Sequence, residues 1–190
     1  MILRDVWEAA SALGTCAAVI VALVFSCRAF ADSRRIEKDR SDLAAARILG
    51  PVSSLEGQVA LLYACLIFND DKYENSDPQI AALLGEIESA ASTITNDDLY
   101  QVLCLPNHAA KRLARALGLI HIFSGQTKYS LSQPRWIRSE VTVKREAYER
   151  WAASVCNIHD HLQIATRQLK SSADTGAPLP SSEEIYGPFD

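Results

Sequence analysis

The stretch AASALGTCAAVIVALVFSC, residues 9–27, decides the fold, because it has no charged residue over 19 positions. A helix rises about 1.5 Å per residue, so a helix of this length spans roughly 29 Å, close to the thickness of the hydrocarbon core of a bilayer. The stretch therefore predicts a transmembrane helix over residues 9–30, preceded by a short N-terminal cap at residues 1–8.

Three alternatives compete for the same residues: a cleaved signal sequence, a lipoprotein signal and a buried soluble helix. Residues 29–31 (AFA) offer an A-x-A cleavage pattern, but nearby acids cancel Arg4 and the apolar run is longer than a usual signal core. Residues 23–27 (LVFSC) loosely match a lipoprotein box, although bulky Phe25 stands where that pattern has a small residue. The length and the flanking charges favour the membrane anchor.

The flanking charges also predict an orientation. Only Arg4 precedes the apolar run, whereas five bases follow it, namely Arg28, Arg34, Arg35, Lys38 and Arg40. Because Lys and Arg near a membrane helix concentrate on the cytoplasmic side, the long C-terminal part is expected to be cytoplasmic. This arrangement is typical of single-pass proteins of the bacterial inner membrane.

Small residues form one stripe along the predicted membrane helix. They recur at every fourth position, as Ala10, Gly14, Ala18, Ala22 and Ser26. Stripes of this kind let two membrane helices approach closely and gain dispersion contacts. The stripe predicts a contact between copies of the chain, although an alanine-rich helix also produces such stripes by chance.

The remaining sequence predicts an all-α protein. A charged helical stalk over residues 31–50 is expected to end in a break or kink at Gly50-Pro51. An antiparallel bundle of four to five helices is predicted over residues 51–172, with helices at 51–68, 78–95, 97–105, 107–123 and 140–170. Asp77 and Asn107 are predicted as N-caps. Residues 173–190, acidic and rich in proline, are predicted to form a disordered tail.

The last predicted helix carries the most regular pattern of the chain. Apolar residues fall on two interleaved rows with heptad spacing, Tyr148, Val155, Leu162 and Leu169 with Trp151, Ile158 and Ala165. Such a seam forms either the spine of an intramolecular bundle or a contact between protomers. The other apolar helices of the chain favour the intramolecular role.

Charge and aromatic residues indicate a contact region in the predicted loop 124–139. The bundle divides into an acidic half, residues 51–105, with net charge −8, and a basic half, residues 106–172, with net charge +7. In the loop, Lys128, Arg135, Trp136 and Arg138 combine bases with an aromatic ring, which suits lipid headgroups or a protein partner. In the alternative interpretation, Trp136 packs inward and the bases meet the acidic half. Nucleic acid is not favoured, because the protein carries a net charge of −4.

The sequence lacks the motifs of catalysis, of cofactor binding and of metal binding. The chain has no Gly-rich phosphate loop and no H-E-x-x-H motif, and its five cysteines show no C-x-x-C spacing. His159 and His161 lie two residues apart and point in different directions on a helix, which disfavours a shared metal. We therefore expect a non-catalytic membrane-anchored interaction or scaffolding module, regulatory in role, that binds a cytoplasmic protein. The alternative is a periplasm-facing helical sensor or a component of the envelope or of lysis, with inverted topology.

Overall fold

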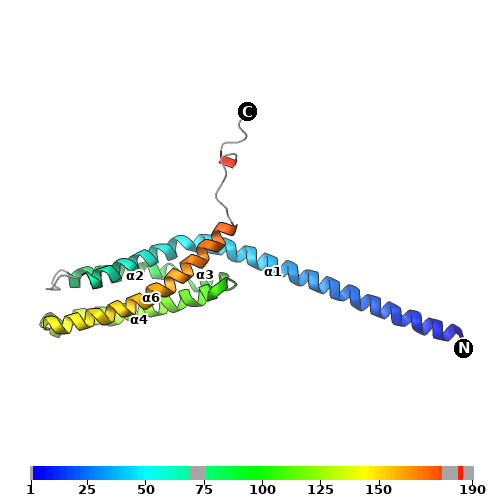
Figure 1. Cartoon of the computed structure of the whole chain (residues 1–190), viewed down its shortest axis with the longest axis horizontal. Coiled ribbons are helices and arrows are strands. Elements are labelled where there is room, and N and C mark those ends of the chain that lie inside the picture. Colours follow the sequence, from blue (N-terminus) through cyan, green and yellow to red (C-terminus); the bar gives the residue numbers. More distant parts are fainter. Residues whose placement is uncertain (1, 69–75, 177–183, 186–190) are drawn as a thin grey trace. The chain divides into compact units, whose positions relative to one another are not determined.

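The computed structural model describes residues 2–68, 76–176 and 184–185, with side chains described from Val19 onward. Within these ranges every regular element is a helix and no strand occurs, so the all-helical prediction is confirmed for the described part of the chain. By its internal contacts the chain divides into two units, Met1–Asp39 and Arg40–Asp190. Figure 1 shows the order of the helices along the chain.

The first unit consists of the N-terminal part of helix α1 (Ile2–Ile67). Every described side chain from position 19 to position 39 is exposed. The exposed residues include large apolar ones, Val19, Ile20, Val21, Leu23, Val24, Phe25 and Phe30. The guanidinium of Arg34 lies over the ring of Phe30, 4.5 Å from its centroid. This unit has no core of its own among its described side chains.

The section Val19–Ile67 of α1 is long and apolar enough to span a membrane, judged by length and composition. Residues 48–67 of this section carry one charged residue, Glu56, and their main apolar stripe is buried in the second unit. Residues 9–18 precede the described side chains. The assignment of residues 9–30 to a membrane therefore rests on their sequence and on the exposure of positions 19–30.

Of the predicted break or kink at Gly50-Pro51, the break does not occur, because α1 continues through Pro51 to Ile67. Proline has no N–H to donate and its ring crowds the carbonyl one turn earlier, so it is unfavourable inside a helix. Here the residues around it, Ile48, Val52 and Leu55, are 3% exposed or less. Their burial on one stripe outweighs the local cost of the proline.

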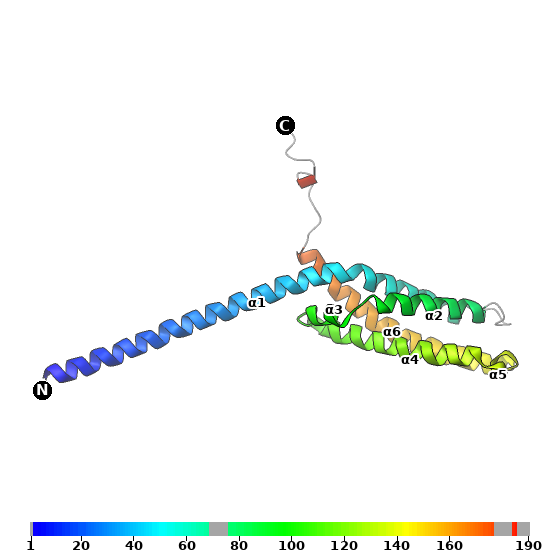
Figure 2. The same ribbon diagram turned by 180° about the vertical axis from the view of Figure 1, so that it is seen from behind.

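The second unit is built on one hydrophobic core. Its helices are the Arg40–Ile67 part of α1, α2 (Ser76–Ser92), α3 (Asn96–Gln101), the 3₁₀ turn η1 (Pro106–His108), α4 (Ala109–Ser132), α5 (Pro134–Ile137) and α6 (Val141–Gly176). The long helices α1, α2, α4 and α6 supply most of the core, and α4 packs against both α2 and α6 (Figures 1 and 2). The short helix α5 lies where α4 ends and α6 begins (Figure 2).

The packed unit begins earlier than the predicted domain start at residue 51. Ser41, Asp42, Ala44, Ala45 and Ile48 are all buried, although they belong to the section predicted as a solvated stalk. Alanine pairs among charged residues give a weak apolar signal, which is why the stripe is hard to see in the sequence. At the other end α6 reaches Gly176 and Ala173 is 7% exposed, inside the predicted tail.

Helix α4 runs to Ser132, so the predicted loop at 124–139 is wrong over most of its length. The side chains of Phe123, Ser124 and Thr127 lie in the core, at 8%, 0% and 0% exposure. Small hydroxyl residues on the buried stripe, together with Gly125, interrupt the apolar spacing from which a helix is predicted. The hydroxyls of Ser130 and Ser132 donate to the carbonyls of Gln126 and Tyr129, each at 2.9 Å, and follow the helix backbone.

Several predicted helix ends also differ. The helix predicted over 97–105 ends at Gln101 and is followed by a turn. The predicted N-cap Asn107 is wrong, because helix α4 starts after His108, and both residues adopt a left-handed backbone, with φ of 55° and 56°. Asp77 lies inside the first turn of α2 rather than at its cap. Residues 69–75, between the predicted helices 51–68 and 78–95, lie outside the described residues.

Candidate functional site

The carboxylate of Asp77 accepts hydrogen bonds from three side chains that are far away in the sequence. The indole Nε1 of Trp136 and the ammonium Nζ of Lys144 donate to Oδ2, at 2.9 and 3.1 Å. The hydroxyl of Tyr148 donates to Oδ1 at 2.7 Å. Asp77 lies in the first turn of α2 in the acidic half, whereas its partners belong to α5 and α6 in the basic half. The contact therefore fixes the start of α2 against the α5–α6 corner.

Three aromatic rings surround this polar contact. The ring centroids of Trp136 and Trp151 are 5.1 Å apart, and those of Tyr148 and Trp151 are 5.4 Å apart. Trp136 and Tyr148 stack at 6.5 Å with an angle of 4° between their planes. The ammonium of Lys144 lies 5.5 Å from the centroid of the Trp136 ring, a geometry that favours a cation–π contact. Lys144 is only 8% exposed, so its charge is neutralised mainly by Asp77.

A groove of about 620 Å³ opens beside the aromatic cluster, and we call it the α5 groove. It lies between the C-terminal part of α4, α5 and the N-terminal part of α6. Its cationic side chains are Arg135 and Arg150 and its aromatic ones are Phe123, Tyr129, Trp136 and Trp151. No acidic residue of the described ranges 2–68, 76–176 and 184–185 lines it. This combination of positive charge with aromatic surface suits a ligand that carries carboxylates next to apolar groups.

The structure brings together some of the contact residues predicted from the sequence and separates others. Arg135 and Trp136 both line the α5 groove. Lys128 instead forms an ion pair with Glu88 of α2, and Arg138 is exposed but does not line the groove. Trp136 is 8% exposed and faces the acidic half, which agrees with the alternative interpretation for this residue.

The sequence prediction missed Arg150 and Asp77 as part of this region. Arg150 precedes Trp151 on the heptad helix and is exposed, with no pattern to distinguish it from a solvated base. The only signal for Asp77 was its place before Pro78, which indicates a helix start and says nothing of Trp136 or Tyr148.

The residues of the heptad seam are oriented toward the core of the same chain. Tyr148, Val155, Ile158, Leu162, Ala165 and Leu169 are each 3% exposed or less, and Trp151 is half-buried. Of the small-residue stripe, Ala22 and Ser26 are exposed. The side chains of Ala10, Gly14 and Ala18 lie outside the described residues.

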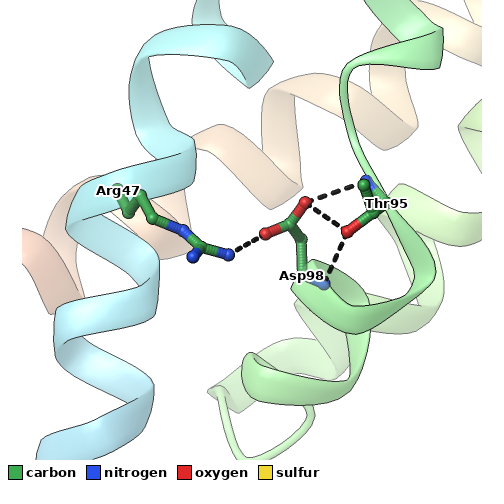
Figure 3. A network of polar contacts seen from close by, with 3 residues as sticks. All are labelled: Arg47, Thr95 and Asp98. Carbon is green, nitrogen blue, oxygen red and sulfur yellow. Dashed lines mark hydrogen bonds and ion pairs between the residues drawn. The ribbon is translucent and has the colours of Figure 1, made fainter.

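A second polar network joins α1 to the start of α3. The Asp98 carboxylate pairs with the guanidinium of Arg47, and it accepts bonds from the N–H and the hydroxyl of Thr95 at 2.8 and 2.7 Å (Figure 3). Thr95 also accepts from the Asp98 N–H, which completes a capping box. The bonds from Thr95, assisted by Arg47, lower the pKa of Asp98 below its usual 3.8. The contribution of this carboxylate to stability is therefore present above pH 3.8 and is lost as the pH falls through the lowered pKa.

The histidines of the last helix lie apart from both networks. The Nε2 of His159 is 4.0 Å from a carboxylate oxygen of Glu56. Burial and the nearby charges of Arg115 and Arg112 lower the pKa of His161 from 6.5, against a smaller opposite effect of Asp160. Within the described residues, no cluster of three or more His, Cys, Asp or Glu side chains is placed to hold a metal ion.

The α5 groove thus combines a concave surface with aromatic and cationic side chains from three helices. Binding sites in proteins commonly combine a mostly apolar concave surface with a few polar groups. Comparison of the chain with protein-family models, with curated proteins and with solved structures finds no significant match.

Proposed function

We propose that the protein is a single-pass, membrane-anchored helical module that presents its bundle to a cytoplasmic protein partner, in a regulatory or scaffolding role without catalysis. The bundle consists of the Arg40–Ile67 part of α1 with α2, α4 and α6, completed by the short helices α3 and α5. The supporting observation is the contrast along α1, whose side chains are all exposed over positions 19–39 and are buried on one stripe from Ser41 onward.

The exposed part of α1 is unfavourable in water. Seven large apolar side chains between Val19 and Phe30 are 48–66% exposed. Full burial of such a side chain is worth about 1.5–3 kcal/mol, so a hydrocarbon environment would stabilise this section considerably. The five bases from Arg28 to Arg40 then favour a cytoplasmic position for the bundle, as the positive-inside rule describes.

The small-residue stripe supports association of copies within the membrane as part of the same proposal. Replacing Gly14 and Ala18 with Leu fills the stripe and separates the helices, which removes their close packing. We expect cross-linking between copies to fall in these variants. Substitution of Ile20 with Leu and of Leu23 with Ile, which conserves volume outside the stripe, is the matched control and should leave cross-linking unchanged.

Reporter fusions after Asp190 test the orientation. A cytoplasmic fluorescent protein fused there should be fluorescent, and a periplasmic alkaline phosphatase fused there should be inactive. The reverse result would contradict the proposal and favour the periplasm-facing sensor or envelope component.

The positive flank provides a control for the same experiment. Substitution of Arg28, Arg34, Arg35 and Lys38 with Ala should reduce the fluorescent fraction and raise phosphatase activity, because these bases set the orientation.

An N-terminal tag tests whether the apolar run is cleaved. A tag that is lost from the mature product would identify the apolar run as a cleaved signal. A tag that is retained in the membrane fraction is expected.

A further inference from the structure

The α5 groove has the electrostatic character of a carboxylate-binding surface. Arg135 and Arg150 line it, and among the residues that the structure describes no acidic side chain does. Helix α6 begins at Val141, between the lining residues Ser139 and Val143, so the positive end of its backbone dipole lies at the rim. An anionic ligand would gain mainly from the two arginines, because the acid Glu140, which directly precedes α6, offsets part of the dipole.

The groove also has accessible apolar surface. Tyr129 is 63% exposed and Val143 is 49% exposed, and the rings of Trp136 and Trp151 form part of the wall. Aromatic rings bind other rings and aliphatic groups over large contact areas. A ligand that fits the groove therefore carries aromatic or aliphatic side chains close to its carboxylates.

The sequence of this chain contains a segment with that composition. Residues 181–190, SSEEIYGPFD, have three acids and no base, interleaved with Ile185, Tyr186 and Phe189. Ile185 is 56% exposed and available for contact. We infer that the α5 groove is a peptide-binding site and that its ligand is the 181–190 segment of a second copy of the chain.

The length of α6 is the reason for a second copy. From Ser154 at the edge of the groove to Gly176 there are 22 residues of helix, about 33 Å at 1.5 Å per residue. Glu183 and Glu184 lie seven and eight residues beyond Gly176, and eight residues span at most about 29 Å when fully extended. Both acids of the same chain therefore stop short of the groove even if the segment runs straight back along α6, and Tyr186 reaches only its edge. If the proposed membrane anchor holds copies in one plane, it also raises their effective concentration.

Binding is measured with a fluorescent synthetic peptide of sequence SSEEIYGPFD and with the protein in detergent micelles. The protein ends at Gly176, so that its own segment does not compete. Fluorescence anisotropy should show saturable binding, and R135E/R150E should weaken it about tenfold or more, because two favourable charge contacts become repulsive. The matched control is R138E, a charge reversal on an exposed arginine next to α5 that does not line the groove; it should change affinity less than about twofold.

Changes in the peptide separate a defined contact from general charge attraction. Peptide Y186A/F189A should bind more weakly, because it loses its rings and keeps its acids. Peptide E183R/E184R should fail on the starting protein and recover binding on R135E/R150E. Circular dichroism must show equal helical content for all protein variants. Absence of binding, equal effects of R138E and R135E/R150E, or indifference to Y186A/F189A would each overturn the inference.

Mixing experiments test the requirement for a second copy. A full-length chain with R135E/R150E has the segment but lacks the groove, and a chain ending at Gly176 has the groove but lacks the segment. The two should associate in a mixture more strongly than either does alone. Failure to associate, while the peptide still binds, would place the contact within one chain and overturn the second-copy assignment. These outcomes do not depend on membrane orientation, so they are separate from a failure of the proposed topology.

Discussion

The ion pair between Asp77 and Lys144 is the most enclosed charge contact in the described part of the second unit. The two side chains are 20% and 10% exposed, so water screens them only partly. Removal of one partner leaves the other charge partly buried without compensation, which is more unfavourable than loss of an exposed pair. Because Trp136 and Tyr148 donate to the same carboxylate, its loss also leaves two further donors without this acceptor.

We predict that Asp77→Ala lowers the free energy of unfolding by about 2–4 kcal/mol. Asp77→Asn should cost less, since an amide oxygen still accepts hydrogen bonds although the charge is lost. Denaturant titration of the purified protein provides the measurement. Glu86→Gln removes an exposed acid from the same helix and serves as control, with an expected change below about 0.5 kcal/mol. Equal effects at both positions would contradict the role assigned to Asp77.

His161 predicts a pH dependence of stability. Burial, Arg115 and Arg112 lower its pKa in the folded state below 6.5, so between that lowered pKa and 6.5 the unfolded chain binds more protons. The free energy of unfolding should therefore fall as the pH drops below about 6.5, well above the range in which Asp98 titrates. His161→Gln should flatten this decrease between pH 7 and pH 5, whereas substitution of the exposed His121 with Gln should leave it in place.

At the scale of whole elements, α6 and α4 show what sequence patterns can and cannot predict. The heptad rows of α6 are apolar and regular, so the helix and its buried face follow from the spacing alone. The last turns of α4 bury Ser124 and Thr127, whose hydroxyls have no hydrogen-bond partner among the described residues. Nothing in the local sequence distinguishes a buried hydroxyl of this kind from one in a loop, and the neighbouring Gly125 favours the loop interpretation.

Gly125 provides a test of the continuous α4 helix. A methyl group added at this position meets no atom within 4 Å, and its backbone is helical. Gly125→Ala should therefore raise the free energy of unfolding by about 0.5–1 kcal/mol, because alanine has the higher helix propensity. Gly118→Ala on the same helix, which is equally unobstructed, should give a similar gain. If residues 124–132 formed a loop, the two substitutions would differ in thermal denaturation.

The α5 groove could be predicted only in part, because the packing of whole helices brings some of its residues together. Arg135 and Trp136 were identified from their local combination of charge and aromaticity, and both line the groove. Arg150 and Asp77 join this region only because α6 and α2 bring them there. They are separated from Trp136 by 14 and 59 residues, which is more than the few residues over which a local sequence pattern extends.

At the scale of the whole chain, the packed unit starts at Arg40 rather than at residue 51. Ala44, Ala45 and Ile48 are each 5% exposed or less, and Arg47 pairs with Asp98 of α3. A fragment over residues 40–176 should unfold cooperatively. A fragment over residues 51–172, the boundaries predicted from sequence, should be less stable by about 3–5 kcal/mol, because it lacks these apolar contacts. Equal midpoints of urea unfolding for the two fragments would show that residues 40–50 contribute nothing to the free energy of unfolding.

The aromatic cluster gives the bundle a spectroscopic signature. In any fragment that starts at Arg40, Trp136 and Trp151 are the only tryptophans, and their ring centroids lie 5.1 Å apart. Electronic transitions on indoles this close couple with each other, and the tilt of 31° between the ring planes makes the coupled pair optically active. Circular dichroism in the aromatic bands should therefore contain a paired positive and negative feature that vanishes when α5 leaves α6. The chain thus carries its own optical probe for that corner, without an added label.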